Sequence, residues 1–398
     1  MSADKLKIAI YSGDIPSTTF IENLIEALSE QEFEVYLFGK LRRKVNYKEN
    51  IKLFPTPQSS LRLIIFVILE GAKLFIKNKS KFNKTIKQLK NKNKNKKSFV
   101  RNLGFILPVL NNQPDIFHIQ WAKTVNLNYE LYNLLDCKIA VSLRGAHINY
   151  SPLNDPELKK AYEIYFPKTD GFHAVSKAIA GEAVKYGADK NKIRVIHSSV
   201  KDEFLLSNAI RKNRNDIFEI ISIGRHHWKK GYHYALDAMN YLKEEGFKFN
   251  YTIIAQGDIP EEILFLLNEY RLNDHVKIIK GMEHVKLMEK LKSSDLLLLP
   301  SVEEGIANVA LEAMSSGVTT LSTDCGGMNE VIHNGENGFI IPVRDPKSIS
   351  GKIMEISRSD PETLLNISLN ALDTIKTEFS REKQKREFSE FYNSLVDG

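Results

Sequence analysis

The sequence predicts an α/β protein made of two domains, each with a parallel sheet. The chain has 398 residues, which is too long for one ordinary hydrophobic core, and its apolar (42%) and charged (26%) fractions are typical of globular proteins. Short apolar runs alternate with stretches of helical periodicity, as expected for parallel strands joined by helices. A polar, aperiodic stretch at residues 205–216 separates the series into two halves and indicates a linker.

The apolar runs give the strands of each half. In the first half we expect strands near residues 7–13, 33–40, 114–121, 138–145, 171–176 and 192–200, with a helix at 19–31. In the second half we expect strands near residues 218–224, 249–257, 276–281, 295–301, 318–323 and 338–343. The predicted domains are therefore residues 1–204, with a basic insertion at about 60–101, and residues 217–380. Residues 381–398 are expected to form a final helix.

The cysteine content and the N-terminus indicate a cytoplasmic protein. Cys137 and Cys325 are the two cysteines of the sequence, and they form neither a CxxC motif nor a Cys/His cluster. This pattern favours a reducing compartment and argues against a zinc site. A strand-like run begins a few residues after Met1, so we expect no signal peptide.

The positive net charge of +7 is concentrated in one segment. Between Lys73 and Arg101 the chain has eleven Lys, one Arg and no acid, so the rest of the chain is mildly acidic. The apolar run before it, near residues 63–69, is too short to span a bilayer. An apolar helix followed by lysines suits peripheral docking on anionic lipid at the inner face of the cell membrane. The alternatives are a core helix and a disordered Lys/Asn-rich loop. Nucleic-acid binding is not expected, because the basic run lacks interleaved aromatic residues.

The stretch EEGIANVALEAM, residues 303–314, has the features of a diphosphate-binding loop and helix. It follows a predicted buried strand, and Gly305 allows the backbone to approach a ligand closely. A helix is expected to begin near Asn308, which leaves the N–H groups of Asn308 and Val309 free to bind an anion.

Two glutamates bracket this stretch. Glu312 lies on the same helix face as Asn308, four residues later, and is suited to accept hydrogen bonds from ribose hydroxyls. Glu304 precedes the helix and is suited to accept hydrogen bonds from a sugar attached to the outer phosphate. The alternative is that both carboxylates are simply solvated.

Together with GRHHWKKG at residues 224–231, this stretch resembles the retaining GT-B glycosyltransferases of family four, also called glycosyl transferases group 1. In that family a strand ends in Gly-Arg, a Lys-Gly follows, and an E-x7-E motif comes later. Arg225, Lys230, Glu304 and Glu312 occupy those positions. The resemblance extends to DCGGMNEVI and NGENGFIIP further along the chain. The chain is similar in this respect to bacterial exopolysaccharide and lipopolysaccharide glycosyltransferases.

The resemblance implies a GT-B fold, with two Rossmann-like domains facing each other across a cleft and the final helix packing back on the first domain. It implies a retaining hexosyltransferase that moves a sugar from a UDP- or GDP-sugar to a hydroxyl of a glycan or lipid-linked acceptor in cell-surface polysaccharide synthesis. No metal or other cofactor is expected, because Arg225, Lys230 and the helix N-terminus can stabilise the departing diphosphate. The implied donor-binding residues are Gly224, Arg225, Lys230, Gly281, Glu304, Gly305, Ile306, Ala307, Asn308, Val309 and Glu312. The implied catalytic residues are Glu304, Arg225, Lys230 and His147.

The first domain matches the family more loosely. Thr18 and Thr19 stand where many relatives have a Gly-Gly loop, and they are the implied acceptor-side donors, as in a variant found in exopolysaccharide transferases. Arg144 occupies the place of a family histidine and cannot act as a base. His147, three residues later, is the candidate replacement, with an ordinary loop histidine as the alternative. His118, expected at a strand end, is predicted to line the acceptor side, with a structural role as the alternative.

Two other functions fit the same sequence. A sugar-nucleotide 2-epimerase on the GT-B scaffold would isomerise the donor, but it needs acids and histidines in the first domain, which are sparse here. A non-catalytic protein that binds nucleotide sugar or anionic membrane is consistent with the missing Gly-Gly loop and histidine.

Overall fold

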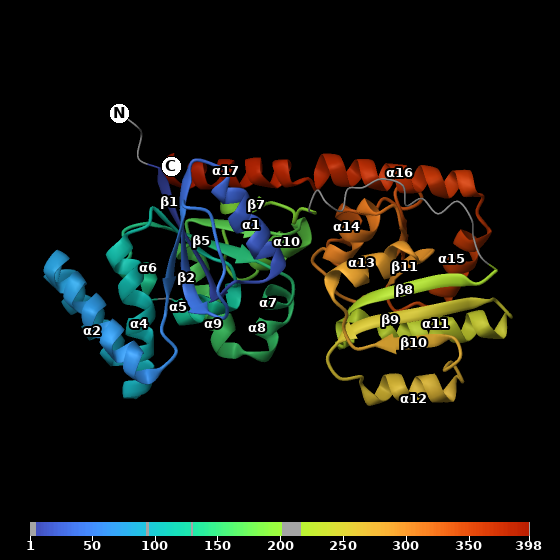
Figure 1. Ribbon diagram of the computed structural model, residues 1–398, viewed down its shortest axis with the longest axis horizontal. Coiled ribbons are helices and arrows are strands. Elements are labelled where there is room, and N and C mark those ends of the chain that lie inside the picture. The colour runs from blue at the N-terminus through green and yellow to red at the C-terminus, as the bar shows by residue number, and fades with distance from the viewer. Residues whose placement is uncertain (1–4, 93–94, 129, 201–215, 398) are drawn as a thin grey trace. The chain divides into compact units, whose positions relative to one another are not determined.

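The protein consists of two compact units, each built on a parallel sheet. The computed structural model describes residues 5–92, 95–128, 130–200 and 216–397. The first unit comprises Met1–Val175, Ile179–Ile196 and Lys385–Gly398, and the second comprises Ser176–Ala178 and His197–Gln384. The predicted linker at 205–216 lies outside the described residues, except for Asp216. Figure 1 shows the helices and strands of both units.

The first unit contains a seven-stranded sheet with the order β3-β2-β1-β4-β5-β6-β7, in which all pairings are parallel. Its strands are β1 (Leu6–Ile15), β2 (Phe33–Leu41), β3 (Ile51–Pro55), β4 (Ile116–Ile119), β5 (Lys138–Leu143), β6 (Gly171–Ala174) and β7 (Ile193–Val195). The sequence analysis missed β3, a short edge strand that ends in a proline. Only one side of this strand pairs, so a continuous apolar run is not required.

Helices cover this sheet. They are α1 (Thr19–Ser29), α2 (Ser60–Lys77), α3 (Lys79–Lys92), α4 (Lys96–Asn112), α5 (Val125–Asn128), α6 (Leu131–Leu134), α7 (Ala146–Asn149), α8 (Ser151–Asn154), α9 (Pro156–Tyr165), α10 (Lys177–Val184) and α17 (Arg381–Asp397). Helix α1 buries Ile21, Leu24, Ile25 and Leu28, the spacing of one helix face. The last helix, α17, adds Phe388, Phe391 and Tyr392 to the same core.

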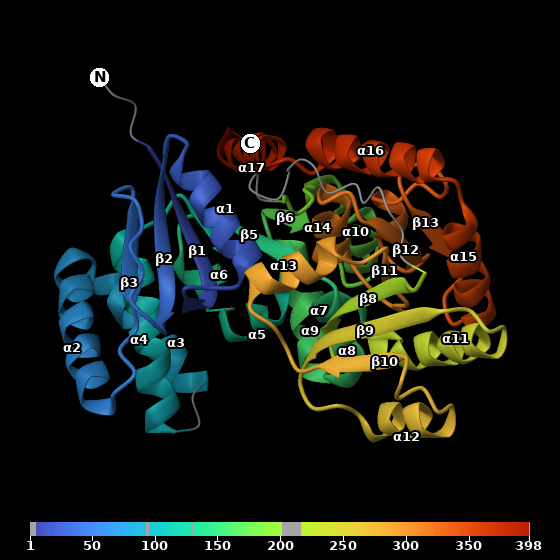
Figure 2. The ribbon, with the colours of Figure 1, turned by 45° about the vertical axis from the view of Figure 1, so that its right-hand side comes forward.

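The basic insertion forms three consecutive helices, α2, α3 and α4, that pack on one another. Helix α2 lies at the outer side of the first unit in both views (Figures 1 and 2). The core-helix alternative holds for one face of α2 alone: Leu74 is buried in the core of the first unit, whereas Leu61, Ile68 and Ile76 are 71%, 64% and 85% exposed. Of the Lys/Asn-rich stretch at residues 90–97, residues 90–92 end α3, residues 96–97 begin α4, and residues 93–94 lie outside the described residues. Within the described part of the chain, no helix has both the length and the apolar character needed to cross a bilayer.

The second unit contains a six-stranded parallel sheet with the order β10-β9-β8-β11-β12-β13. Its strands are β8 (Phe218–Arg225), β9 (Phe249–Gln256), β10 (Val276–Ile279), β11 (Leu296–Leu299), β12 (Thr319–Thr323) and β13 (Phe339–Ile341). Its helices are α11 (Tyr232–Glu244), α12 (Glu261–Glu269), α13 (His284–Lys292), α14 (Asn308–Ser315), α15 (Pro346–Arg358) and α16 (Pro361–Glu378). Strand β11 is buried along its whole length, because helices pack on both faces of the sheet.

Candidate functional site

Two loops at the carboxyl ends of the neighbouring strands β8 and β11 form the candidate site of the second unit. The first loop follows β8 and contains a 3-10 turn at Trp228–Lys230, and the second runs from β11 to α14. The Val302 N–H donates to the Lys229 carbonyl oxygen at 2.8 Å and joins the loops. At Gly231, where φ is +63°, a Cβ atom would lie 2.0 Å from the Pro300 carbonyl oxygen. Only glycine permits so close an approach of the two backbones.

A buried cluster of charges lies between these loops. The Lys230 ammonium contacts Glu304 Oε1, and the Lys229 Nζ atom lies 3.5 Å from Glu303 Oε2 and 3.9 Å from Glu304 Oε2. The Ser301 hydroxyl donates to Glu304 Oε1 at 3.2 Å. Burial alone would raise the pKa of Glu304, but the two lysines outweigh it and lower that pKa. Glu304, which is 6% exposed, is therefore an ionised carboxylate inside the protein.

Glu312 lies in a different environment on α14. This helix begins at Asn308, as expected from the sequence, and the amide groups of its first turn have no acceptor within the helix. The side chain of Glu312 is 24% exposed, and its Oε1 atom lies 3.2 Å from His284 Nε2. Burial raises the pKa of Glu312, and His284 opposes the shift only in part.

The DCGG segment supports the loop that carries Glu304. A Cβ atom at Gly326, where φ is +56°, would lie 1.7 Å from the Glu304 carbonyl oxygen. A Cβ atom at Gly327 would lie 2.2 Å from the Gly305 carbonyl oxygen. The two glycines therefore let the segment pack directly against the backbone of the loop and fix its position.

The remaining predicted donor-binding residues lie at the ends of β8 and β10 and next to α14. Gly224 leaves space for two side chains, since a Cβ atom there would lie 2.8 Å from the Tyr232 hydroxyl and 3.1 Å from Lys230 Cε. Arg225 is the exposed last residue of β8. Gly281 follows β10 with φ +68°. Ile306 is half-buried, and Ala307 is the N-cap of α14.

Four site residues were not predicted: Lys229, Ser301, His226 and Tyr232. The Tyr232 hydroxyl and both ring nitrogens of His226 are buried and form no hydrogen bond with any described residue. Buried polar atoms without partners often mark a place where a ligand binds. The motif GRHHWKKG contains two of the four, His226 and Lys229, but its spacing does not show that Lys229 is buried or that the ring of His226 has no hydrogen bond with a described residue.

In the first unit, aromatic side chains bring the acceptor-side residues together. Thr18 is the N-cap of α1 and Thr19 its first residue, and both are exposed. The next residue, Phe20, packs edge-on against Trp121 with ring centroids 5.6 Å apart. Trp121 in turn lies 5.2 Å from the ring of His147. The carboxyl ends of β1 and β4 and the helix after β5 thus contribute to one cluster.

Arg144 belongs to this cluster. Its guanidinium carbon lies 4.3 Å from the centre of the Phe20 ring, and its Nη2 atom donates to Gln120 Oε1 at 3.2 Å. Burial lowers the pKa of Arg144 to about 9, which keeps the side chain protonated at neutral pH. Gln120 and Phe20 were not predicted, and both hold Arg144 in place.

The prediction that His118 lines the acceptor side is wrong. His118 pairs in register with Ile10 and Ala140 inside the sheet, and its side chain is fully buried. Its Nδ1 atom lies 2.7 Å from the Tyr392 hydroxyl and its Nε2 atom 2.9 Å from the Ser142 hydroxyl. The alternative is correct, because His118 is a core histidine whose two ring nitrogens both have partners.

Sequence profiles of two families match the chain. "Glycosyltransferase Family 4" matches residues 17–204, and "Glycosyl transferases group 1" matches residues 206–373. The chain belongs to these glycosyltransferases. The two matches together span most of the sequence and meet between the predicted domains.

Curated relatives carry related names. The chain is 28% identical to the colanic acid biosynthesis glycosyltransferase WcaL of Salmonella typhimurium over 265 residues, 65% of this chain and 63% of that protein. It is 25% identical to the amylovoran biosynthesis glycosyltransferase AmsK of Erwinia amylovora, over 71% of this chain and 70% of that protein. The chain thus spans less than two thirds of the length of WcaL.

Solved structures share the fold across almost the whole chain. HepE of Anabaena in complex with UDP has a TM-score of 0.70 and 16% identity, covering 98% of this chain and 100% of that one. Sucrose-phosphate synthase of Thermosynechococcus elongatus has a TM-score of 0.75 and 14% identity, covering 98% and 99%. The GT-B fold predicted from the sequence is confirmed.

Proposed function

We propose that the protein moves a hexosyl group from a nucleoside diphosphate sugar to a hydroxyl of a glycan or lipid-linked acceptor, with retention of configuration, in cell-surface polysaccharide synthesis. The observation that carries this proposal is the buried cluster of Lys229, Lys230 and Glu304 beside the N-terminus of α14. It combines cations for a diphosphate with a carboxylate for sugar hydroxyls.

In this proposal the donor diphosphate binds Lys230, Arg225 and the first-turn amides of α14. These groups stabilise the negative charge that develops when the bond between the sugar and the diphosphate breaks. Glu304 accepts hydrogen bonds from the sugar, and Glu312 accepts them from the ribose. When Lys230 turns to the phosphate, Lys229 remains near Glu304 and keeps its carboxylate ionised.

The acceptor hydroxyl attacks the anomeric carbon from the face that the diphosphate leaves, and a phosphate oxygen takes its proton. Arg144 is not the base, because it is protonated at neutral pH. It would bind an anionic part of the acceptor or the diphosphate, next to Thr18, Thr19 and His147. No metal is required, since the cations of the site neutralise the leaving group. Activity is therefore expected to persist in the presence of a chelator.

Relatives and structural neighbours support this reading. The named relatives act in the biosynthesis of colanic acid, amylovoran and capsular polysaccharide. HepE was crystallised with UDP and with UDP-glucose, which favours a UDP-sugar as donor. These names do not favour the 2-epimerase or the non-catalytic alternative. We also propose that residues 60–101 hold the protein on the inner face of an anionic membrane.

The test combines nucleotide binding with product analysis. Calorimetry with UDP and GDP is expected to detect binding of one of them, weakened at least tenfold in Lys230→Met and Arg225→Ala. Incubation with the matching sugar nucleotides and a panel of glycan acceptors should release nucleoside diphosphate and give an axially linked product from an axial donor by NMR. Unchanged binding in both variants, or an isomerised donor without transfer, would overturn the proposal.

A further inference from the structure

Helix α2 exposes an apolar stripe that no described part of the chain covers. Leu61, Ile65, Ile68 and Ile76 follow one another at helical spacing and are 71%, 50%, 64% and 85% exposed. A continuous apolar face of this kind is uncommon on soluble proteins and marks a surface that binds a partner or a membrane. The two ends of α2 are polar, so the stripe is bounded along the helix.

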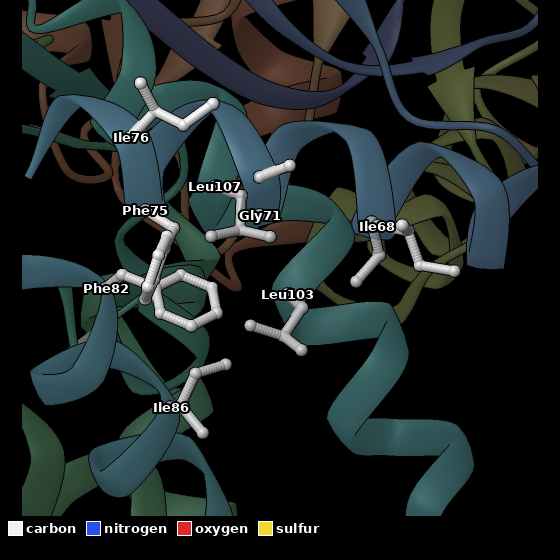
Figure 3. Close-up of a pocket in the computed structure, with 10 residues that line it drawn as sticks. Ile68, Gly71, Phe75, Ile76, Phe82, Ile86, Leu103 and Leu107 are labelled. Carbon is white, nitrogen blue, oxygen red and sulfur yellow. The ribbon is translucent and has the colours of Figure 1, made fainter. Parts of the chain in front are cut away.

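A cavity of about 490 Å³ lies between α2, α3 and α4. All ten residues that line it are apolar or glycine. Phe82, Ile86, Leu103 and Leu107 project into it from α3 and α4 (Figure 3). Gly71 widens it, because a Cβ atom there would lie 3.4 Å from the Phe82 ring. Its volume is in the range of sites that bind small molecules.

The stripe and the cavity are continuous. Ile68 and Ile76 belong to both, because each lines the cavity and is more than half exposed. Figure 3 shows these two residues on α2 at either end of the lining. An apolar ligand can therefore reach the cavity from the stripe without crossing a polar surface.

The three helices that carry this apolar surface are strongly basic. Residues 60–101 contain eleven Lys, two Arg and one acid, Glu70. Glu70 is buried, and its carboxylate accepts hydrogen bonds from Lys73 at 2.5 Å and from Asn111 at 2.7 Å. Lys87 and Lys90 on α3 and Lys96 and Lys97 on α4 are exposed. The same helices thus present both an apolar face and exposed cations.

We propose that α2, α3 and α4 form a lipid-binding site, in which the cavity accepts one hydrocarbon chain of an anionic membrane lipid and the lysines bind lipid phosphates. The cavity offers no polar side chain to a ligand, so it suits a chain without hydrogen-bonding groups better than a peptide backbone. A second copy of this basic surface would repel the first. This inference deepens the membrane contact proposed above and does not depend on sugar transfer.

The first experiment measures vesicle binding of the full chain by flotation. Vesicles of phosphatidylcholine with 30% phosphatidylglycerol should bind the protein at 50 mM NaCl and lose most of it at 500 mM, whereas pure phosphatidylcholine should bind little. Each basic residue near an anionic surface contributes about 1 kcal/mol, roughly fivefold in affinity. Replacement of Lys87, Lys90, Lys96 and Lys97 by Gln should therefore weaken binding by roughly 600-fold if the four contributions add.

A matched pair of variants tests the stripe. Ile68→Ser/Ile76→Ser should weaken binding at least tenfold. Leu264→Ser/Phe265→Ser should leave it unchanged, because that second exposed apolar pair, 51% and 64% exposed, lies on α12, whose first turn is acidic. Equal binding to neutral vesicles, or equal loss in the α12 control, would overturn the proposal. So would a dimer, seen by light scattering, that disappears in the α2 variant.

The second experiment tests the cavity itself. Phosphatidylglycerol with a photoreactive group on one acyl chain should crosslink to Phe82, Ile86 or Leu103 in the wild type. Ala72→Trp, at an exposed position that lines the cavity, should abolish these crosslinks but reduce vesicle binding less than threefold. Crosslinks confined to the stripe would overturn the chain-binding site. Nucleotide binding measured on the same samples separates failure here from failure of the proposed transferase function.

Discussion

Glu304 and Glu312 lie on one loop–helix segment, eight positions apart, in opposite electrostatic environments. Glu304 is buried between Lys229 and Lys230, which lower its pKa. Glu312 is partly exposed, and burial raises its pKa by more than the contact with His284 lowers it. The sequence motif does not reveal this difference in environment. Two neighbouring lysines favour the charged form of Glu304, whereas burial disfavours the charged form of Glu312.

The largest effect is expected when the charge of Glu304 or of its partner Lys230 is removed. Glu304→Gln and Lys230→Met are each expected to lower kcat by about 10²–10³, the usual cost of losing one group that stabilises developing charge. Steady-state transfer assays with the donor found by calorimetry would measure this. Lys376→Met, an exposed lysine of α16, is the matched control and should retain full activity. Full activity in Glu304→Gln would show that transfer does not need the charge of Glu304.

The position of the Glu304 loop can be tested without touching its charge. Gly326→Ala should destabilise the protein by about 2 kcal/mol or more, because the new Cβ atom would lie 1.7 Å from the Glu304 carbonyl oxygen at a left-handed φ. Gly351→Ala, in the middle of α15 with no atom within 4 Å of the new Cβ, should be neutral or stabilise by up to about 1 kcal/mol. Thermal unfolding measures both. Equal thermal midpoints for Gly326→Ala and Gly351→Ala would show that the backbone at residue 326 can move away from the Glu304 carbonyl group without a loss of stability.

Replacement of Glu312 is expected to have a smaller effect, on the donor KM and on how that KM changes with pH. Glu312→Gln should raise the donor KM about tenfold, about 1.4 kcal/mol of binding. In the wild type the donor KM should rise as the pH falls through the raised pKa of Glu312, because a protonated carboxyl group is a weaker acceptor of the ribose hydrogen bonds than the carboxylate. The variant should show a KM that does not change over the same range. A pH-dependent KM in Glu312→Gln would assign the titration to another group.

The smallest expected effect is on stability, with opposite signs for the two residues. A lowered pKa means that Glu304 contributes stability above its ordinary pKa and loses it as the pH falls through the folded value. A raised pKa means that Glu312 lowers stability as the pH rises from its ordinary pKa through the folded value. Relative to the wild type, the thermal midpoint of Glu312→Gln should therefore increase with pH, and that of Glu304→Gln should decrease. Changes of the same sign in the thermal midpoints of the two variants would contradict the opposite pKa shifts of Glu304 and Glu312.

The sequence predicted the fold and the position of the loops after β8 and β11, for physical reasons that are local. Strand β11 is a continuous apolar run, β8 is mostly apolar, and the glycines around them mark close backbone approaches. The helix after Ala307 has strong helical character and begins where the motif places it. All the strands that the apolar runs predicted are present.

What the sequence missed depends on contacts between distant segments. His118 has the polarity of a site residue, but Tyr392, 274 positions away, provides its partner in the core. The side chains of Lys229 and Lys230 are both largely buried against Glu304, which a pair of adjacent lysines does not reveal. The apolar face of α2 has the periodicity of a core helix, and only the packing shows that it is exposed.

The C-terminal helix has a consequence for how the protein is made. Tyr392 bonds to His118, and Leu395 lies so close to Gly171 that a Cβ atom there would be 2.5 Å away. The final residues of the chain are thus part of the core of the first unit. During synthesis the rest of the first unit emerges from the ribosome before Lys385–Gly398, so its core stays incomplete until nearly all of the second unit has also been synthesised. A nascent chain therefore depends on residues 385–398 to complete the fold of its first unit.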